Sequence, residues 1–297
     1  MAQQLLNAIT LGSIYMLFAI GLSLSWGVLD ILNLAHGAIL MFGALAVYLL
    51  AKHIGGVPFA ILLPVAMVLC GLVAVLLERI AFRPIRRRVV DVHARELAML
   101  IASVGAGATI VAIAERSTNN QLASIGPEVF NVTSTTIFGL HTTNISLIII
   151  VLAVVLTGAL AAFVKYTRYG RALRALAVDP YMCGLMGISA DRMTALTMFV
   201  SGAIAGGAGV LLAIEQGGFE ANMGESLMLK AFAVIILGGV GSIAGAAFGA
   251  FLLAIVETAM VVYVDGSLQN GVAFVLIFLI LIVRPQGIFA RRGWQRA

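Results

Sequence analysis

The sequence predicts an all-α membrane protein, a bundle of about nine spanning helices, with eight and ten as the alternatives. The first observation is composition: 62% of the 297 residues are hydrophobic and only 10% are charged, whereas an ordinary soluble domain carries about 25% charged residues. The second is a series of apolar runs of about 20 residues, the length that crosses a bilayer as a helix. So few charges would not cover the surface of a soluble protein, and we therefore expect the chain to lie in lipid.

The apolar runs give the order of the expected spans. The runs 5–25 and 57–77 flank a further span at about 34–52. Region 226–264 is expected to add a hairpin or a re-entrant segment, with the glycine-rich stretch 238–245 at its turn. No polar stretch is long enough for a soluble domain, so residues 1–297 are expected to form a single transmembrane domain. The other spans are expected at 97–114, 145–164, 194–214 and 270–283.

Basic residues orient these spans. Fifteen of the 18 lysines and arginines lie in 79–95, in 165–192 and in the tail from 284. The positive-inside rule places such segments on the cytoplasmic face, which explains them better than nucleic-acid binding does. Counting the crossings between these segments puts the N-terminus outside and the C-terminus in the cytoplasm.

Two segments indicate broken helices. Residues 36–47 and 244–255 both follow a polar or glycine-containing break, and both bring small residues into a new span. Transporters that contain internal repeats often have such breaks near the middle of the membrane. The sequence therefore leaves open an internal repeat within the single domain.

Polar residues at or inside the expected spans are candidates for function. Ionisable groups in lipid cost several kcal/mol unless they are paired or face water. For Glu257 the alternative is a structural hydrogen bond to a neighbouring helix. For Lys230 and Asp30 the alternative is a place at a helix end, from which the side chain reaches the membrane interface.

The stretch NLAHG, residues 33–37, interrupts an apolar run with an amide, an imidazole and a glycine. Asn33 and His36 are one helical turn apart, so both can face the same side of a helix. Gly37 would let a neighbouring backbone approach or let the helix start from a break. We read the stretch first as a packing and helix-break element that shapes a path through the bundle, with direct solute contact as the alternative.

A second group of candidates lies in the stretch GGVGSIAG. Gly241, Gly245 and Gly249 recur every four residues, which places them on one helix face. Small residues at this spacing let helix backbones approach closely in lipid. The alternative is a smooth surface beside a transport path or at a dimer seam. Gly239 and Ser242 are included among the helix-break candidates.

The basic loop 165–193 has the pattern of two short helices rather than of a flexible tether. Leu173 and Leu176 recur at helical spacing among arginines. Asp179 followed by Pro180 is typical of a helix start, and Gly187 is typical of a helix end. Such an amphipathic element could lie on the lipid surface or dock in a groove of another protein.

Motifs for chemistry are absent from the sequence. It contains no GxxxxGK[ST] phosphate-binding loop, no HExxH, no GxSxG and no Asp and Glu cluster with metal spacing. We therefore expect no enzyme activity, no metal and no cofactor in this chain.

Several segments together resemble one family, the branched-chain amino-acid permeases of ABC importers, most closely its LivH-type subunits. NxAHG (33–37) and GGxGSxxG (238–245) are the specific motifs, and Leu34 departs from the phenylalanine or methionine of many relatives. The resemblance covers nearly the whole chain in order, and its segments are 12–44, 78–88, 169–189, 230–250 and 284–289.

The resemblance implies a multi-pass permease of the bacterial inner membrane that pairs with a second, LivM-like permease. Two cytoplasmic ATPase subunits would hydrolyse ATP, and a periplasmic binding protein would deliver the solute. The family imports branched-chain amino acids, and also urea, short amides and carboxylates. By family analogy the loop 165–193 contacts the ATPases, through Gly170, Arg171, Ala175, Asp179 and Gly187.

One alternative from a different class remains. The chain could act as a stand-alone secondary transporter of small solutes, driven by protons through His36, Lys230 or Glu257. That alternative predicts uptake without ATP, whereas the ABC permease requires its ATPase subunits.

Overall fold

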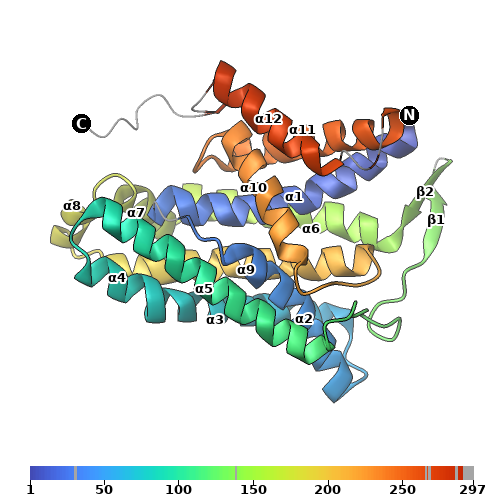
Figure 1. Cartoon of the computed structure of the whole chain (residues 1–297), viewed down its shortest axis with the longest axis horizontal. Coiled ribbons are helices and arrows are strands. Elements are labelled where there is room, and N and C mark those ends of the chain that lie inside the picture. Colours follow the sequence, from blue (N-terminus) through green and yellow to red (C-terminus); the bar gives the residue numbers. More distant parts are fainter. Residues whose placement is uncertain (30–31, 138, 265, 267–268, 285–286, 290–297) are drawn as a thin grey trace.

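The chain folds as a helical bundle with one small β-hairpin (Figure 1). The computed structural model describes residues 1–29, 32–137, 139–264, 266, 269–284 and 287–289. Asp30 and the tail arginines Arg291, Arg292 and Arg296 lie outside the described residues.

Within the described residues, seven helices are long and apolar enough to cross a membrane, which confirms a polytopic helical membrane protein. The α3 helix runs on through a π-helical turn (Glu78–Phe82) into α4 (Arg83–Arg88). Two shorter helices, α10 (Met223–Gly238) and α12 (Gln269–Val283), complete the C-terminal part. The seven are α1 (Ala2–Leu29), α2 (His36–Ile54), α3 (Phe59–Leu77) with its extension, α5 (Val92–Thr118), α6 (Asn144–Tyr166), α9 (Ala190–Glu215) and α11 (Ile243–Tyr263).

The core is centred on α9, which is buried along most of its length. Its glycines allow close contact with two neighbours: a Cβ added at Gly202 would lie 2.8 Å from the Cys70 carbonyl oxygen of α3. A Cβ at Gly43 of α2 would overlap the backbone of Gly206. Helices associate in lipid by close approach of their backbones at small residues. The glycines of residues 202–209 allow α9 to pack in this way.

The helices give the molecule two distinct ends (Figure 1). Helices α1, α6, α9 and α11 run alongside one another, whereas α2 and α10 cross them steeply. The short α4, α7 (Arg168–Leu176) and α8 (Pro180–Leu185) gather at one end, and the N-terminus and the hairpin lie at the other. The basic segments around 79–88 and 165–192 therefore share one end of the bundle.

One element departs from an all-α fold. The polar loop after α5 contains an antiparallel hairpin of β1 (Ser134–Ile137) and β2 (Leu140–Thr143). Threonine-rich segments suit strands, and Gly139 has a φ of 77°, which a tight turn accepts. The Gln3 amide of α1 exchanges two hydrogen bonds with the His141 backbone, at 2.7 and 2.9 Å, and so tethers the hairpin.

The expected helix break at 238–245 is found. Helix α10 ends at Gly238 and α11 begins at Ile243. Gly239 and Gly241 have φ values of 93° and 77°, which glycine adopts readily. Ser242 caps α11, because its Oγ accepts a 3.0 Å hydrogen bond from the Gly245 backbone N–H.

Candidate functional site

A buried charge pair joins three helices in the interior of the bundle. The Lys230 Nζ of α10 lies 3.1 Å from the Glu257 Oε2 of α11. The Tyr15 hydroxyl of α1 donates to the same Glu257 oxygen at 2.7 Å and accepts from Lys230 Nζ at 2.8 Å. Glu257 is fully buried and Lys230 is 8% exposed. Each charge therefore has a partner within hydrogen-bond distance, as a charge removed from water requires.

This arrangement shows where the two residues lie and what they contact. Lys230 lies in the middle of α10 and is buried, so the expectation that it reaches the interface from a helix end is wrong. Glu257 does bond a neighbouring helix, through Tyr15. Tyr15 is not among the candidates predicted from the sequence, although a buried tyrosine hydroxyl inside an apolar span usually has a hydrogen-bond partner.

The stretch 33–37 forms a turn that leads into α2, and both polar side chains in it are buried. The Asn33 Oδ1 accepts from the Ala35 N–H at 3.1 Å, and the Asn33 carbonyl accepts from the His36 N–H at 3.2 Å. Asn33 thus precedes the helix, and the expectation that it shares a helix face with His36 is wrong, because the helical period does not extend into the turn.

His36 packs against α1. Its ring stacks on Phe18 with 4.9 Å between centroids, and its Nε2 lies 3.4 Å from the Phe18 carbonyl oxygen. Within the described residues, the other ring nitrogen has no hydrogen-bond partner. These contacts support the packing role predicted for the stretch.

Glycine contacts join the two helix-break regions to their neighbours. A Cβ at Gly37 would lie 2.5 Å from the Gly224 carbonyl oxygen, so α2 and α10 touch through backbone at their first turns. A Cβ at Gly27 of α1 would lie 2.5 Å from the Gly241 Cα in the break. Gly245 likewise meets the backbone of Gly238. These contacts leave no room for larger side chains.

The loop 165–193 folds as the two helices that its sequence predicts. Leu173 and Leu176 of α7 are buried, while Arg171 is exposed. The Asp179 Oδ1 caps α8 by accepting from the Tyr181 and Met182 N–H groups, at 2.9 and 3.0 Å.

Small residues fix the ends of this helical pair. Gly170 is buried, and a Cβ there would overlap the Val164 backbone of α6. The Ala175 carbonyl accepts from the Asp179 N–H at 3.0 Å, which turns the chain from α7 into α8. Gly187 has a φ of 78° and ends α8. The pair is therefore an ordered unit that packs against α6 and α9.

Helix α8 exposes large apolar side chains, which face away from the bundle. Cys183 is buried beneath them. Met186 is 81% exposed and Tyr181 is 74% exposed. Exposed apolar patches on an ordered element mark contact surfaces. We call this surface the α8 face and define it as Val178, Tyr181, Met182, Leu185 and Met186.

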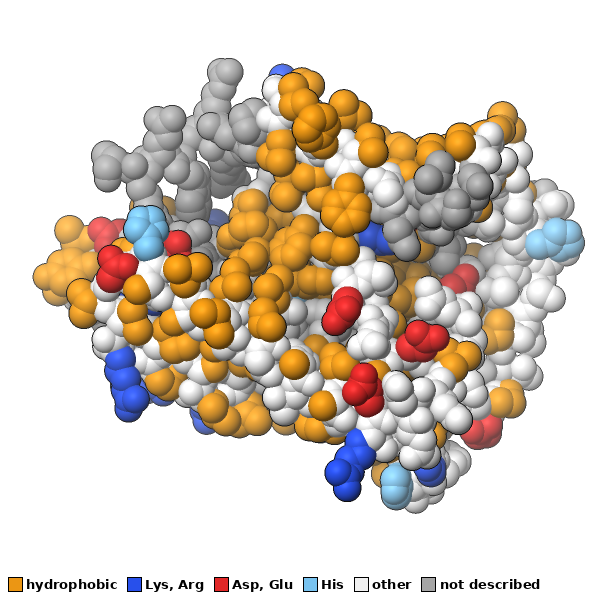
Figure 2. Space-filling model, viewed as in Figure 1, with side chains coloured by type: hydrophobic (Ala, Val, Ile, Leu, Met, Phe, Trp, Pro, Cys, Tyr) orange, Lys and Arg blue, Asp and Glu red, His pale blue; other side chains and the backbone are white. Residues whose placement is uncertain are grey.

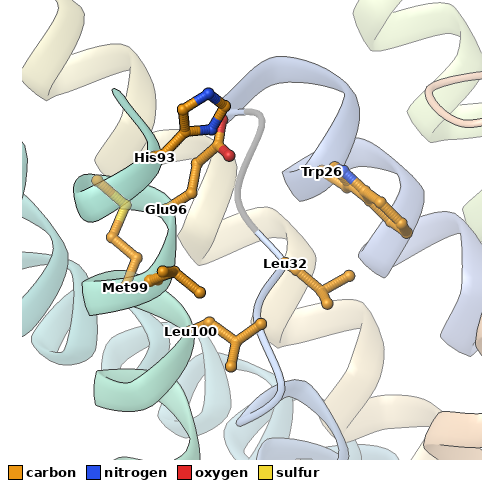
Figure 3. A pocket seen from close by; sticks show the side chains of 7 residues that line it. Trp26, Leu32, His93, Glu96, Met99 and Leu100 are labelled. Atoms are coloured by element: carbon orange, nitrogen blue, oxygen red, sulfur yellow. The ribbon is translucent and has the colours of Figure 1, made fainter. Parts of the chain in front are cut away.

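A pocket opens between the end of α1 and the first turns of α5 (Figure 3). Trp26 and Leu32 face it from one side, and Met99 and Leu100 from the other. His93 and Glu96 lie close together at its rim (Figure 3). Of its described lining residues, none is among the predicted site residues.

The outer surface of the bundle is largely apolar. Hydrophobic side chains cover much of the face on which α5, α10 and α12 lie (Figure 2). Ile101 of α5, Leu229 of α10 and Phe278 of α12 are each more than two-fifths exposed. Exposed side chains of this kind suit contact with lipid or with another membrane subunit.

Membrane-length helices around an interior charge pair, with an ordered helical loop at their basic end, make this a multi-pass membrane protein. The chain belongs to the branched-chain amino-acid transport permease family: residues 4–283 match the family described as "Branched-chain amino acid transport system / permease component". Members of this family are transport components and not enzymes, which confirms the expectation that this chain has no enzyme activity.

Individual relatives agree with this assignment. The chain is 33% identical to the high-affinity branched-chain amino-acid permease LivH of Salmonella typhimurium, over 97% of this chain and 95% of the relative. It is 32% identical to BraD of Pseudomonas aeruginosa over the same shares. It is also 28% identical to the permease LivM of Escherichia coli, over 94% of this chain and 68% of that protein. No solved structure shows significant similarity to it.

Proposed function

We propose that the chain is the permease subunit of a binding-protein-dependent ABC importer in a bacterial inner membrane. It moves branched-chain amino acids, or a related small polar solute such as urea, an amide or a carboxylate, into the cell. It pairs with a second, LivM-like permease, in line with its similarity to both LivH and LivM proteins. Two cytoplasmic ATPase subunits hydrolyse the ATP, and a periplasmic binding protein delivers the solute.

The α8 face is the observation that carries this proposal. It is an apolar surface on an ordered helical pair, at the end of the bundle where the basic residues gather. A helix that presents apolar anchors suits a groove in another protein. We assign residues 165–193 as the coupling loop, with Gly170, Asp179 and Gly187 fixing its shape and Arg171 and Ala175 at the contact.

The topology follows from the same assignment. Placing the coupling loop in the cytoplasm puts the N-terminus and the hairpin outside and the C-terminus inside. The seven long helices together with α10 and α12 then give nine segments in the membrane. Residues 1–297 form one permease domain, and an internal repeat would relate the breaks before α2 and α11.

We assign the path of the solute to the region where the helix breaks before α2 and α11 lie next to α2 and α10, the two helices that cross the bundle steeply. Asn33, His36 and Gly37 shape it at the start of α2. Lys230 and Glu257 hold α10 in place from the other side. The break residues Gly239, Gly241, Ser242 and Gly245 let α11 start close to α10.

The decisive experiment is reconstitution in liposomes. The purified chain, alone and together with its partner permease and ATPases, is tested for uptake of leucine, urea and amides with the binding protein outside. We expect uptake only from the full assembly with ATP. Uptake by the chain alone under a proton gradient would overturn the proposal in favour of a secondary transporter.

The α8 face gives a more specific prediction. Met186→Asp places a charge in an apolar contact, and we expect association with the ATPases to weaken by about 2 kcal/mol, or about 30-fold in Kd. The measurement is binding of the ATPase subunits to the detergent-solubilised permease pair.

The matched control is Val90→Asp, because Val90 is 91% exposed just after α4 but lies outside the α8 face. Val90→Asp should bind the ATPases as the wild type does. Equal affinity of Met186→Asp and wild type would show that α8 is not part of the contact.

The imidazole of the NLAHG stretch gives a second prediction. His36→Ala removes the stack on Phe18, and we expect a smaller yield of assembled importer with an unchanged order of preference among solutes. Uptake competition between leucine, urea and amides checks the preference. A changed order would contradict the packing role and favour direct solute contact.

A further inference from the structure

The arginines of the basic segment 79–88 form ion pairs with acids of the bundle, in addition to orienting the membrane spans. Three of its arginines converge on one acid of α9: the Asp191 carboxylate lies 2.9 Å from Arg83, 3.3 Å from Arg86 and 2.6 Å from Arg87. Arg86 also binds Glu78, with 2.6 Å between its Nη2 and the Glu78 Oε1. Arg86 thus bridges two acids from different helices.

The Glu78 side of this cluster is built into the interior. Glu78 is 1% exposed and opens the π-helical turn between α3 and α4. Such turns insert a residue into a helix and often mark functional positions. A buried carboxylate needs a fixed counter-charge, and Arg86 supplies it.

The Asp191 side of the cluster lies next to the coupling loop. Asp191 is the second residue of α9, which begins directly after α8 and its closing glycine. Any displacement of α8 therefore reaches α9 first at this turn. The same α9 packs against α3 deeper in the bundle, where Gly71 faces Phe199.

We propose that Glu78, Arg86 and Asp191 form a charge clamp that makes the α3–α4 segment and α9 move as one body when the ATPases displace the coupling loop. The proposal rests on the coupling role assigned above to residues 165–193. The three are positioning residues, which act by passing movement of the loop to the spans. Without the clamp, the end of α9 would shift alone and α3 would lag behind.

The test uses the full importer in liposomes and measures solute moved per ATP hydrolysed. Asp191→Asn removes the charge that three arginines share. We expect ATP hydrolysis to continue while the transport-to-hydrolysis ratio falls about fivefold or more, the size of a typical coupling effect. Arg86→Gln removes the link to Glu78 but leaves Arg83 and Arg87 bound to Asp191, so it should lower the ratio less, and Asp191→Glu should restore the ratio.

Arg88→Gln is the matched control. Arg88 lies on the same helix, is exposed and makes no ion pair within the described part of the chain. The transport-to-hydrolysis ratio of Arg88→Gln should equal that of the wild type. A wild-type ratio in Asp191→Asn would overturn the clamp. Failure of the wild-type assembly to couple ATP to uptake would instead overturn the proposed function.

A distance measurement tests the charge clamp independently, in case a variant assembles too poorly for the transport assay. Spin labels on Arg88→Cys and Arg192→Cys report the distance from α4 to the start of α9; the native Cys70 and Cys183 are buried. We expect one narrow distance distribution, with and without ATP, and a broader one when Asp191→Asn is added. A distribution that Asp191→Asn leaves unchanged would overturn the clamp.

Discussion

Replacing Lys230 with methionine is expected to abolish uptake, because the substitution leaves the Glu257 carboxylate buried without its ammonium partner. Breaking a buried ion pair by removing one member costs about 3–5 kcal/mol, a large fraction of the 5–15 kcal/mol that stabilises a typical protein. We therefore expect most of the Lys230→Met protein to be lost before it reaches the membrane in folded form. The fraction that elutes as a single species from size exclusion in detergent measures this loss.

The double variant Lys230→Met with Glu257→Gln separates stability from transport. Removing both charges of a buried pair is often nearly neutral for stability, so most of the folded fraction should return. Tyr15→Phe is the milder control, because it removes one hydroxyl and leaves both charges. If Lys230→Met alone folded as well as the wild type, the pair would not hold α10 in place.

Gly37→Val is the second substitution with a large expected effect. The first side-chain carbon alone would lie 2.5 Å from the Gly224 carbonyl oxygen, and a backbone atom of a packed helix does not yield as a flexible side chain does. Overpacking typically costs 1–3 kcal/mol, and the branched valine should push α2 and α10 apart. We expect uptake below about a tenth of wild type, with a lowered midpoint of thermal unfolding.

Gly158→Ala is the matched control for this substitution. Gly158 lies in α6, and a Cβ there would meet nothing within 4 Å. In a helix, alanine in place of glycine stabilises by roughly 0.5–1 kcal/mol, so this variant should unfold at the wild-type temperature or slightly above it. Equal thermal midpoints for Gly37→Val and wild type would contradict the close approach of α2 and α10.

Sequence reasoning succeeded where the determinants are local. The cap at Asp179, the helix end at Gly187 and the break at Gly239 each depend on residues within a few positions along the chain. Backbone conformation and capping act over that range, so the helical pair α7–α8 and the start of α11 could be predicted with useful accuracy.

Side-chain contacts between segments that lie far apart along the chain could not be predicted from the sequence. Tyr15 and Glu257 are 242 positions apart, and Arg86 and Asp191 are 105 apart. Both contacts depend on how the helices pack, which a single sequence does not encode as a period or a spacing. The positive-inside rule also treated the arginines of 79–88 alike, although Arg86 bridges two acids and Arg88 is exposed.

The failure at Asn33 has a different cause. A three-residue separation puts two side chains on one face only if the helix already includes both residues. Here α2 begins at His36, and the Asn33 amide oxygen is engaged with the turn before it. Boundaries of broken helices are set by such turns, and the apolar run gave no sign of where the turn ends.

The composition of the α8 face has a consequence for how the importer responds to its surroundings. Two of its five residues are methionines, and Met186 is the most exposed of them. Oxidation of an exposed methionine to the sulfoxide makes a flexible apolar side chain polar, and reductases reverse the change. Under the coupling role proposed for this face, the sulfoxide would weaken the contact with the ATPases, and its reduction would restore that contact without synthesis of a new protein.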